Sequence, residues 1–102
     1  MFPKFAVIDN ATSGDNTIVA AVTGKKIRVL QVCLIAAGAM TVRFESAASG
    51  TALTGQMNVN STTGFNSGYC PTGHFETVAG ELLNLELSAA TSADGWIVYM
   101  EV

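Results

Sequence analysis

The sequence predicts an all-β chain that forms one domain, an antiparallel β-sandwich of the jelly-roll type. Three observations lead to this fold class. Ten glycines divide the 102 residues into segments mostly shorter than the roughly 10 to 12 residues of a typical globular helix. Apolar and polar residues alternate along most of these segments, as in strands with one buried face. Glycine-containing turns recur about every 8 to 14 residues, which is typical of two packed antiparallel sheets.

Turns at Gly14, Gly24 and Gly38 separate the first expected strands, 5–10, 16–22, 26–36 and 40–46. Strand 26–36 is rich in β-branched residues and apolar on both sides, so both of its faces need cover. Its inner face would hold Leu30, Val32 and Leu34, and its outer face Val29, Gln31, Cys33 and Ile35. In strand 40–46 only every second residue is apolar, which predicts one solvent-facing side that includes Glu45.

The second half of the chain predicts shorter strands at 52–53, 56–60, 68–70, 74–78, 82–89 and 96–102. Strand 82–89 alternates cleanly, whereas strand 96–102 is apolar on both sides. Ala79-Gly80 and Asp94-Gly95 are expected to be turns between these strands. The segment 60–73 is the longest irregular stretch, and long loops in compact domains often carry function.

Composition and charge exclude several classes of protein. A 49% hydrophobic, 13% charged chain is not disordered, and its net charge of −3 is unsuited to nucleic acid. The most apolar run, 29–42, is shorter than the roughly 20 residues of a membrane span, and we expect no secretory signal because the first residues lack the necessary apolar stretch. All five basic residues lie in the first 43 residues, while six of the eight acidic residues follow them. This asymmetry is either neutralised within one subunit or forms complementary patches between subunits.

No catalytic, cofactor or metal site is predicted. His74 is the only histidine, so no two-histidine metal site is possible. Cys70 and His74 lie four residues apart around Pro71 and Gly73, but nothing in the sequence supplies an oxyanion donor for a cysteine nucleophile. Cys33 and Cys70 are expected to remain reduced in a cytosol. We therefore expect a protein that is not an enzyme.

The apolar surplus predicts self-association, because a domain of this size cannot bury so many apolar residues in one core. The predicted subunit interface comprises Val29, Gln31, Cys33 and Ile35. A second hypothesis is a glycan-binding module in which Trp96 and the loop 60–73 contact a sugar. Tyr69, Tyr99, Phe65 and Phe75 could also stack on a sugar, and Asn58, Asn60, Asn66 and Asp94 could hydrogen-bond to it. Trp96 is nevertheless expected to lie in the core.

Three segments resemble a group of small virion proteins of tailed bacteriophages, the capsid decoration or cement proteins. They are 14–30 (GDNTIVAAVTGKKIRVL), 75–85 (FETVAGELLNL) and 95–102 (GWIVYMEV). The resemblance implies a jelly-roll-like subunit, made in the bacterial host cytoplasm, that forms a homotrimer on the outer capsid surface. Such a trimer ties neighbouring major capsid proteins together against the pressure of the packaged DNA. The resemblance carries over no catalytic residue.

On this hypothesis residues 14–102 form the β-sandwich, and residues 1–13 form an N-terminal arm with the first strand. The arm and the basic turn would contact the capsid through Lys4, Lys25, Lys26 and Arg28. The alternative places the chain on a tail fibre or baseplate, where it would bind host glycans.

Overall fold

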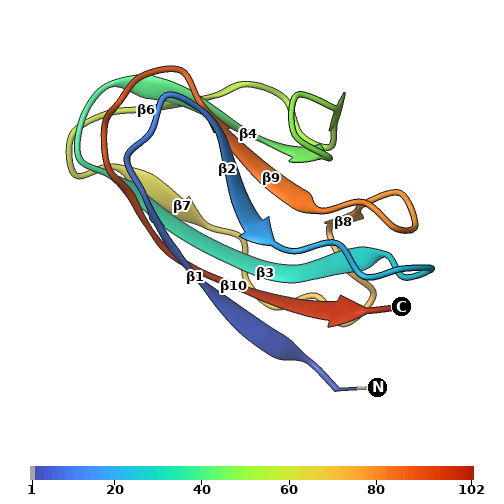
Figure 1. The fold of residues 1–102 in the computed structure, drawn as a ribbon. Helices are drawn as coiled ribbons and strands as arrows, with labels where there is room; N and C mark the ends of the chain where they lie inside the picture. Colours follow the sequence, from blue (N-terminus) through green and yellow to red (C-terminus); the bar gives the residue numbers. More distant parts are fainter. Residues whose placement is uncertain (1) are drawn as a thin grey trace.

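The computed structural model describes residues 2–102 and contains two five-stranded antiparallel sheets (Figure 1). Met1, the first residue of the expected arm, lies outside the described residues. The prediction of an all-β, single-domain chain is confirmed, because the described residues form only strands, turns and loops. No helix among them has the length and apolar character needed to cross a membrane.

Sheet A has the strand order β1-β10-β3-β7, and β8 also pairs with β3. Its strands are β1 (Lys4–Asn10), β3 (Ile27–Ala36), β7 (Gly64–Asn66), β8 (Phe75–Glu76) and β10 (Ala93–Glu101). Sheet B has the order β2-β9-β4-β5, and β6 also pairs with β4. Its strands are β2 (Gly14–Val19), β4 (Met40–Ser46), β5 (Thr51–Ala52), β6 (Met57–Val59) and β9 (Leu83–Leu87). The predicted bounds of β4 are confirmed, and most other predicted strands are shifted by a few residues.

One core joins the two sheets, because each contributes the apolar side chains of one face. Sheet A supplies Ile8, Val32, Leu34 and Ile97 among others, and sheet B supplies Val42, Phe44, Leu83, Leu85 and Leu87. The rings of Phe44 and Phe75, from opposite sheets, lie 5.3 Å apart between centroids. Full burial of each such side chain contributes about 1.5 to 3 kcal/mol. The alternation seen in the sequence therefore determines which face of each strand is covered.

The predicted outer face of β3 is wrong at Val29. The register between β10 and β3 shifts at Val98 and Tyr99, which lie opposite Gln31 and Val29, so that Leu30 is an extra residue. Because of this extra residue, side chains on one side of the bulge no longer continue the alternation seen on the other side. Val29 is consequently fully buried in the core, and Leu30 is buried outside the main core cluster. Val29 is thus not available for a subunit interface.

The strand predicted at 68–70 is also wrong, since the regular strand lies earlier, at β7. Positive φ angles at Gly68 (74°) and Gly73 (89°) turn the chain away from a straight path. The segment 67–74 nevertheless follows β3, because Cys70 and His74 each donate a backbone hydrogen bond to it, of 2.8 Å. This segment closes one edge of sheet A.

The turn predicted at Asp94-Gly95 lies instead inside β10. Gly95 has a φ of 153°, and a Cβ atom at this position would lie 1.9 Å from the carbonyl oxygen of Cys33 on β3. Glycine is required here by the close approach of two central strands rather than by a turn.

We predict that Gly95→Ala lowers the melting temperature by roughly 5 to 20 °C, because the strand must separate from β3 or adopt a strained backbone. Thermal unfolding followed by circular dichroism measures this effect. Gly55→Ala is the matched control, since a Cβ atom at Gly55 contacts nothing within 4 Å. Equal melting temperatures for the two variants would contradict the assignment.

Candidate functional site

The outer face of sheet A carries side chains from four adjacent strands in aligned rows. Val7 of β1 lies opposite Trp96 of β10, which lies opposite Cys33 of β3, which in turn lies opposite Asn66 of β7. Directly paired residues in a sheet point to the same side. The neighbouring residues Ile8, Ile97, Val32 and Leu34 are in the core, so this row faces away from it.

Two further rows on the same side of the sheet flank this one. Phe5, Val98 and Gln31 form one of them, and Asp9, Asp94 and Ile35 form the other. Four large apolar side chains on these rows are exposed: Phe5 (75%), Val7 (66%), Ile35 (54%) and Trp96 (44%). We call the surface formed by Phe5, Val7, Ile35, Trp96, Cys33 and Val98 the apolar face. It is the candidate functional site, because exposed apolar patches on small proteins mark interaction surfaces.

The apolar face includes part of the predicted interface. Gln31, Cys33 and Ile35 lie on this side of β3, whereas Val29 does not. Phe5 and Val7 were not part of the prediction, although alternation around Ile8 would have placed them outside. Trp96 was expected in the core, but it is exposed because Ile97 takes the inward position.

Charged residues border the apolar face at its two ends. At one end Asp9 and Asp94 lie directly opposite each other on β1 and β10. Loss of hydration, and secondly contact with the Asp9 carboxylate, raises the pKa of Asp94. At the other end Arg28 lies opposite Glu76 and donates a hydrogen bond of 2.9 Å to it. This contact with Arg28, followed by that with Lys26, lowers the pKa of Glu76.

Strands β1 and β3 begin at the end of the molecule that carries both termini (Figure 1), and the predicted capsid-contact residues Lys4 and Arg28 lie at these beginnings. Lys26 lies at the same end, because its backbone exchanges two hydrogen bonds with Val102. Lys4 and Lys25 line one open cavity of about 380 Å³, together with Phe2 and Glu101. Lys4 pairs with Glu101 at 3.1 Å, and Lys26 pairs with Glu76 at 3.1 Å. Within residues 2–102 Lys25 is the one basic residue that forms no ion pair.

These ion pairs show where the basic residues at the start of the chain find acidic partners. Every ion pair of the described residues joins a base from residues 1–43 to an acid that follows residue 43. Much of the asymmetry is therefore neutralised within one subunit, because the topology places the two halves of the chain side by side.

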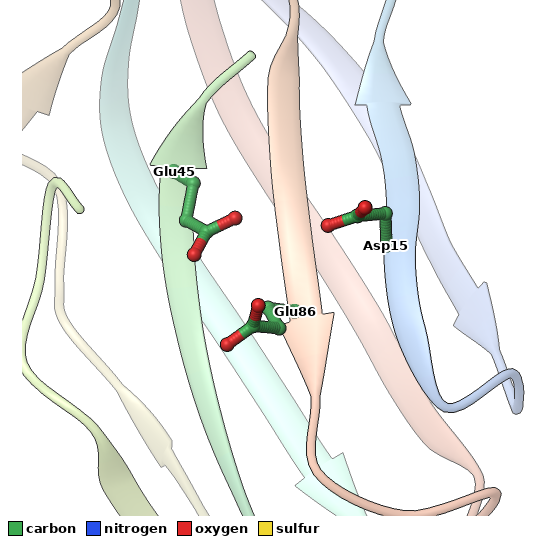
Figure 2. Close-up of side chains that lie close together, drawn as sticks. All are labelled: Asp15, Glu45 and Glu86. Atoms are coloured by element: carbon green, nitrogen blue, oxygen red, sulfur yellow. The ribbon is translucent and has the colours of Figure 1, made fainter. Parts of the chain in front are cut away.

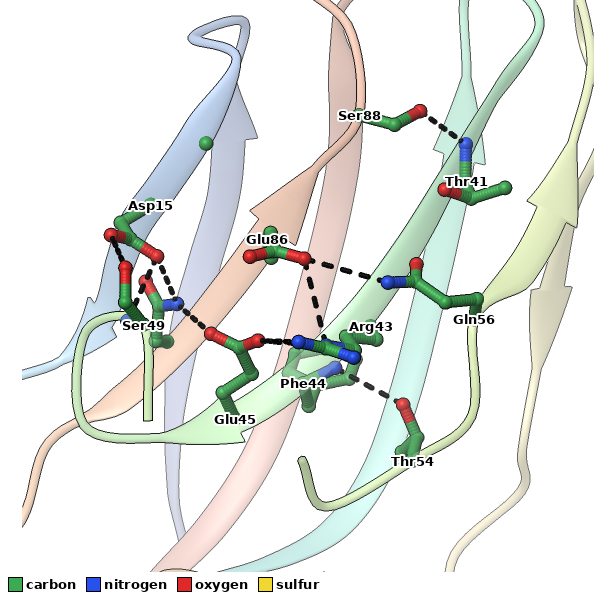
Figure 3. A network of polar contacts seen from close by, with 12 residues as sticks. Asp15, Thr41, Arg43, Phe44, Glu45, Ser49, Thr54, Gln56, Glu86 and Ser88 are labelled. Atoms are coloured by element: carbon green, nitrogen blue, oxygen red, sulfur yellow. Dashed lines mark hydrogen bonds and ion pairs between the residues drawn. The ribbon is translucent and has the colours of Figure 1, made fainter. Parts of the chain in front are cut away.

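The outer face of sheet B is polar and carries three carboxylates on adjacent strands, Asp15, Glu45 and Glu86 (Figure 2). Glu45 is fully buried although the sequence predicted a solvent-facing position. Arg43 donates to Glu45 at 2.7 Å, and Asn84 donates to both Glu45 and Asp15, at 2.8 and 2.9 Å (Figure 3). The presence of Arg43 two residues away on the same face was the available signal for a paired Glu45.

One ligand oxygen from each of these carboxylates lies within 4.8 Å of the others, a spacing that a metal ion could bridge. However, the carboxylates already have partners in the protein. Ser49 donates to Asp15 through its backbone N–H (3.1 Å) and its hydroxyl (2.7 Å), and Arg43 lies 3.5 Å from Glu86. Contact with Ser49, and then with Asn84, lowers the pKa of Asp15. The cluster is therefore explained as a network that ties β2, β9 and β4 together.

Cys70 and His74, weighed from the sequence as a reactive pair, have separate partners. The Cys70 sulfur lies 3.3 Å from the Thr72 hydroxyl, and this contact lowers the pKa of the thiol. His74 Nε2 lies 3.0 Å from the carbonyl oxygen of Gly68. Both Cys33 and Cys70 are free thiols. The geometry thus gives no support to the pair as a nucleophile and base.

Comparison with known proteins gives no match: no protein-family model, curated protein or solved structure is similar to the chain.

We predict opposite effects of removing two carboxylates at neutral pH. The raised pKa of Asp94 means that folding disfavours its charged form, so stability falls as pH rises through its folded-state pKa. The lowered pKa of Asp15 means that its charged form stabilises the fold, and this stability is lost at acid pH. At pH 7 Asp94→Asn should raise the melting temperature by about 2 to 5 °C, the scale of a cross-strand charge repulsion.

Asp15→Asn, the matched comparison, should lower the melting temperature at pH 7. Both differences should shrink as the pH is lowered toward 3, where the wild-type carboxylates become protonated. Thermal unfolding of the three proteins across this pH range measures the effect. Shifts of the same sign at pH 7 would contradict the assigned environments.

Proposed function

We propose that the chain is a non-enzymatic structural subunit that self-associates through the apolar face. The observation that carries this proposal is the exposure of Phe5, Val7, Ile35 and Trp96 on one side of sheet A. Covering such a face removes apolar surface from water and contributes about 25 cal/mol per Å². We further propose a jelly-roll-like β-sandwich as the finer description of the fold, which the two packed antiparallel sheets support.

The assembly we propose is a homotrimer in which Gln31, Cys33 and Ile35 face neighbouring subunits. This oligomeric state comes from the resemblance to capsid decoration proteins. The polar network on sheet B supports an orientation in which that sheet stays in water. A trimer can bind a capsid through several equivalent contacts at once, which strengthens binding without any new chemistry.

We propose that the partner is a major capsid protein on the outer surface of a bacteriophage virion. The end of the molecule with Lys4, Lys25, Lys26 and Arg28 would contact it. Since Lys4, Lys26 and Arg28 already pair with Glu101 and Glu76, Lys25 is the base most available to an acidic partner surface. A protein that binds the assembled shell preferentially stabilises that shell.

The apolar face predicts that Ile35→Asp removes the three-fold association, so that the 10.6 kDa subunits no longer form trimers. A charge at this position would have to be desolvated at the interface, which is unfavourable. The folded subunit should remain stable, because Ile35 is 54% exposed. Multi-angle light scattering at micromolar concentration measures the mass.

Val78→Asp is the matched control, since Val78 is 55% exposed and belongs to none of the rows of the apolar face. This control should keep the mass of the wild-type protein. A monomeric wild-type protein at micromolar concentration would reject the trimer.

The capsid proposal predicts that Lys25→Glu weakens coating of empty capsids by roughly tenfold or more, because three copies of the change act together in a trimer. Lys25→Arg should preserve binding, and rising salt should weaken binding of the wild-type protein. Cosedimentation with empty capsids of the phage that carries the chain measures the effect. Absence of coating by the wild-type trimer would reject the capsid assignment while leaving self-association in place.

A glycan-binding module is the second candidate, and the exposure of Trp96 supports it. Half-exposed tryptophan can stack on a sugar ring, and Asn66 lies on the same row as Trp96, beyond Cys33. We propose a tail-fibre or baseplate location for this alternative. A chain that ignores capsids but binds a glycan array, and loses that binding in Trp96→Ala, would favour the second candidate over the first.

A further inference from the structure

Strand β1 forms an open edge of sheet A. It lies at one end of the strand order and pairs with β10 alone, over seven consecutive residues. None of its residues takes part in the other backbone hydrogen bonds formed within residues 2–102. The backbone N–H and C=O groups on the far side of β1 therefore have no strand partner in one subunit.

The other sheet edges of the described chain are short or irregular. In sheet A the opposite edge consists of β7 and β8, with three and two residues, separated by the bonded loop 67–74. In sheet B, β5 and β6 have two and three residues, and β2 has a register shift between Thr17 and Val19. Short strands, bulges, prolines and charges are the usual means of preventing edge pairing.

Strand β1 has none of these protections along its centre. It contains no proline, its register with β10 is continuous, and no charged residue lies between Lys4 and Asp9. Phe5 and Val7 are the two most exposed side chains of the apolar face, and both lie on this strand. An edge of this kind pairs readily with another strand.

We propose that β1 pairs antiparallel with β1 of a second copy across a two-fold axis, with Ala6 opposite its own copy. In this register Phe5 lies opposite Val7 of the second copy, twice by symmetry. A register shifted by one residue would place outward side chains opposite inward ones. Two neighbouring registers are also permitted. The register with Val7 opposite its own copy would place Phe5 opposite the charged Asp9, and the register with Phe5 opposite its own copy would place Val7 opposite Pro3, which lies outside β1 and has no backbone N–H. The apolar pairing therefore selects Ala6 as the axis residue.

This contact goes beyond the proposed function, because it is two-fold and uses the backbone edge of β1 rather than Gln31, Cys33 and Ile35 of β3. In a trimer it would connect one trimer to the next through β1, so that sheet A of one subunit continues into sheet A of another. The same two-fold contact would form between monomers whose apolar face has been disrupted.

The test is disulfide trapping at the proposed axis. Ala6→Cys is introduced into a background of Cys33→Ser and Cys70→Ser, which removes both native thiols. Directly opposite residues of antiparallel strands have Cα atoms about 4.5 to 5.5 Å apart, within the range of a disulfide. Mild oxidation should therefore give a covalent dimer on a non-reducing gel. Val7→Cys in the same background should not, because its own copy would lie two residues away along the strand.

A second pair of variants tests the contact without thiols. Phe5→Lys should weaken the two-fold association roughly tenfold, because it removes both Phe5–Val7 pairs. Phe2→Lys is the matched control, since Phe2 is 83% exposed and lies outside β1, and it should associate like the wild-type protein. Both substitutions are at exposed positions, so the fold should be retained. Analytical ultracentrifugation across a concentration series measures the association.

Both tests are repeated with Ile35→Asp, which separates this proposal from the trimer. A dimer that survives Ile35→Asp and is lost with Phe5→Lys would support β1 pairing even if no trimer exists. Absence of the Ala6→Cys dimer, or trapping through Val7→Cys in its place, would overturn the proposal. Equal association of the Phe5→Lys and Phe2→Lys variants in the Ile35→Asp background would also overturn it, and neither result would bear on the three-fold contacts of Gln31, Cys33 and Ile35.

Discussion

The pairing of β10 with two neighbours is the interaction on which the rest of the structure depends. β10 pairs with β1 over seven residues and with β3 over nine, so it joins the two ends of the chain to its central strand. The requirement for Gly95 against the Cys33 carbonyl shows how closely β10 and β3 approach. This pairing sets the register in which inward residues form the core and outward residues form the apolar face.

The outer faces of the two sheets differ in the chemistry of the side chains that point away from the core. On sheet B, Glu45 and Asn84 are fully buried yet fully hydrogen-bonded, and Arg43 connects Glu45 to Glu86. Buried polar groups are tolerated when they are paired in this way. On sheet A the outward residues are mainly apolar and have no such partners. One side of the molecule is therefore suited to water and the other to contact with protein.

Charge plays a small part in the surface, because most of the charge asymmetry of the sequence is neutralised within one subunit. The bases of the first half and the acids of the second meet across paired strands, as Arg28 and Glu76 do on β3 and β8. The charged side chains left to contact another protein lie in two places. Lys25 lies at one end of the molecule, and Asp9 and Asp94 lie opposite each other at the other end. In the association proposed above, such isolated charges would set the orientation and apolar contacts would supply the stability.

The sequence by itself determined the all-β class, the single domain and most strands, because alternation and glycine spacing are local signals of strand and turn. It also placed Gln31, Cys33 and Ile35 on the outer side of β3, where the structure has them. Only the tertiary structure placed Val29 in the core, Trp96 at the surface, Gly95 inside a strand and Glu45 in a buried network. Each of these depends on a bulge, a close approach or a partner from a distant segment, and pairings between distant residues leave no periodic signal in the sequence.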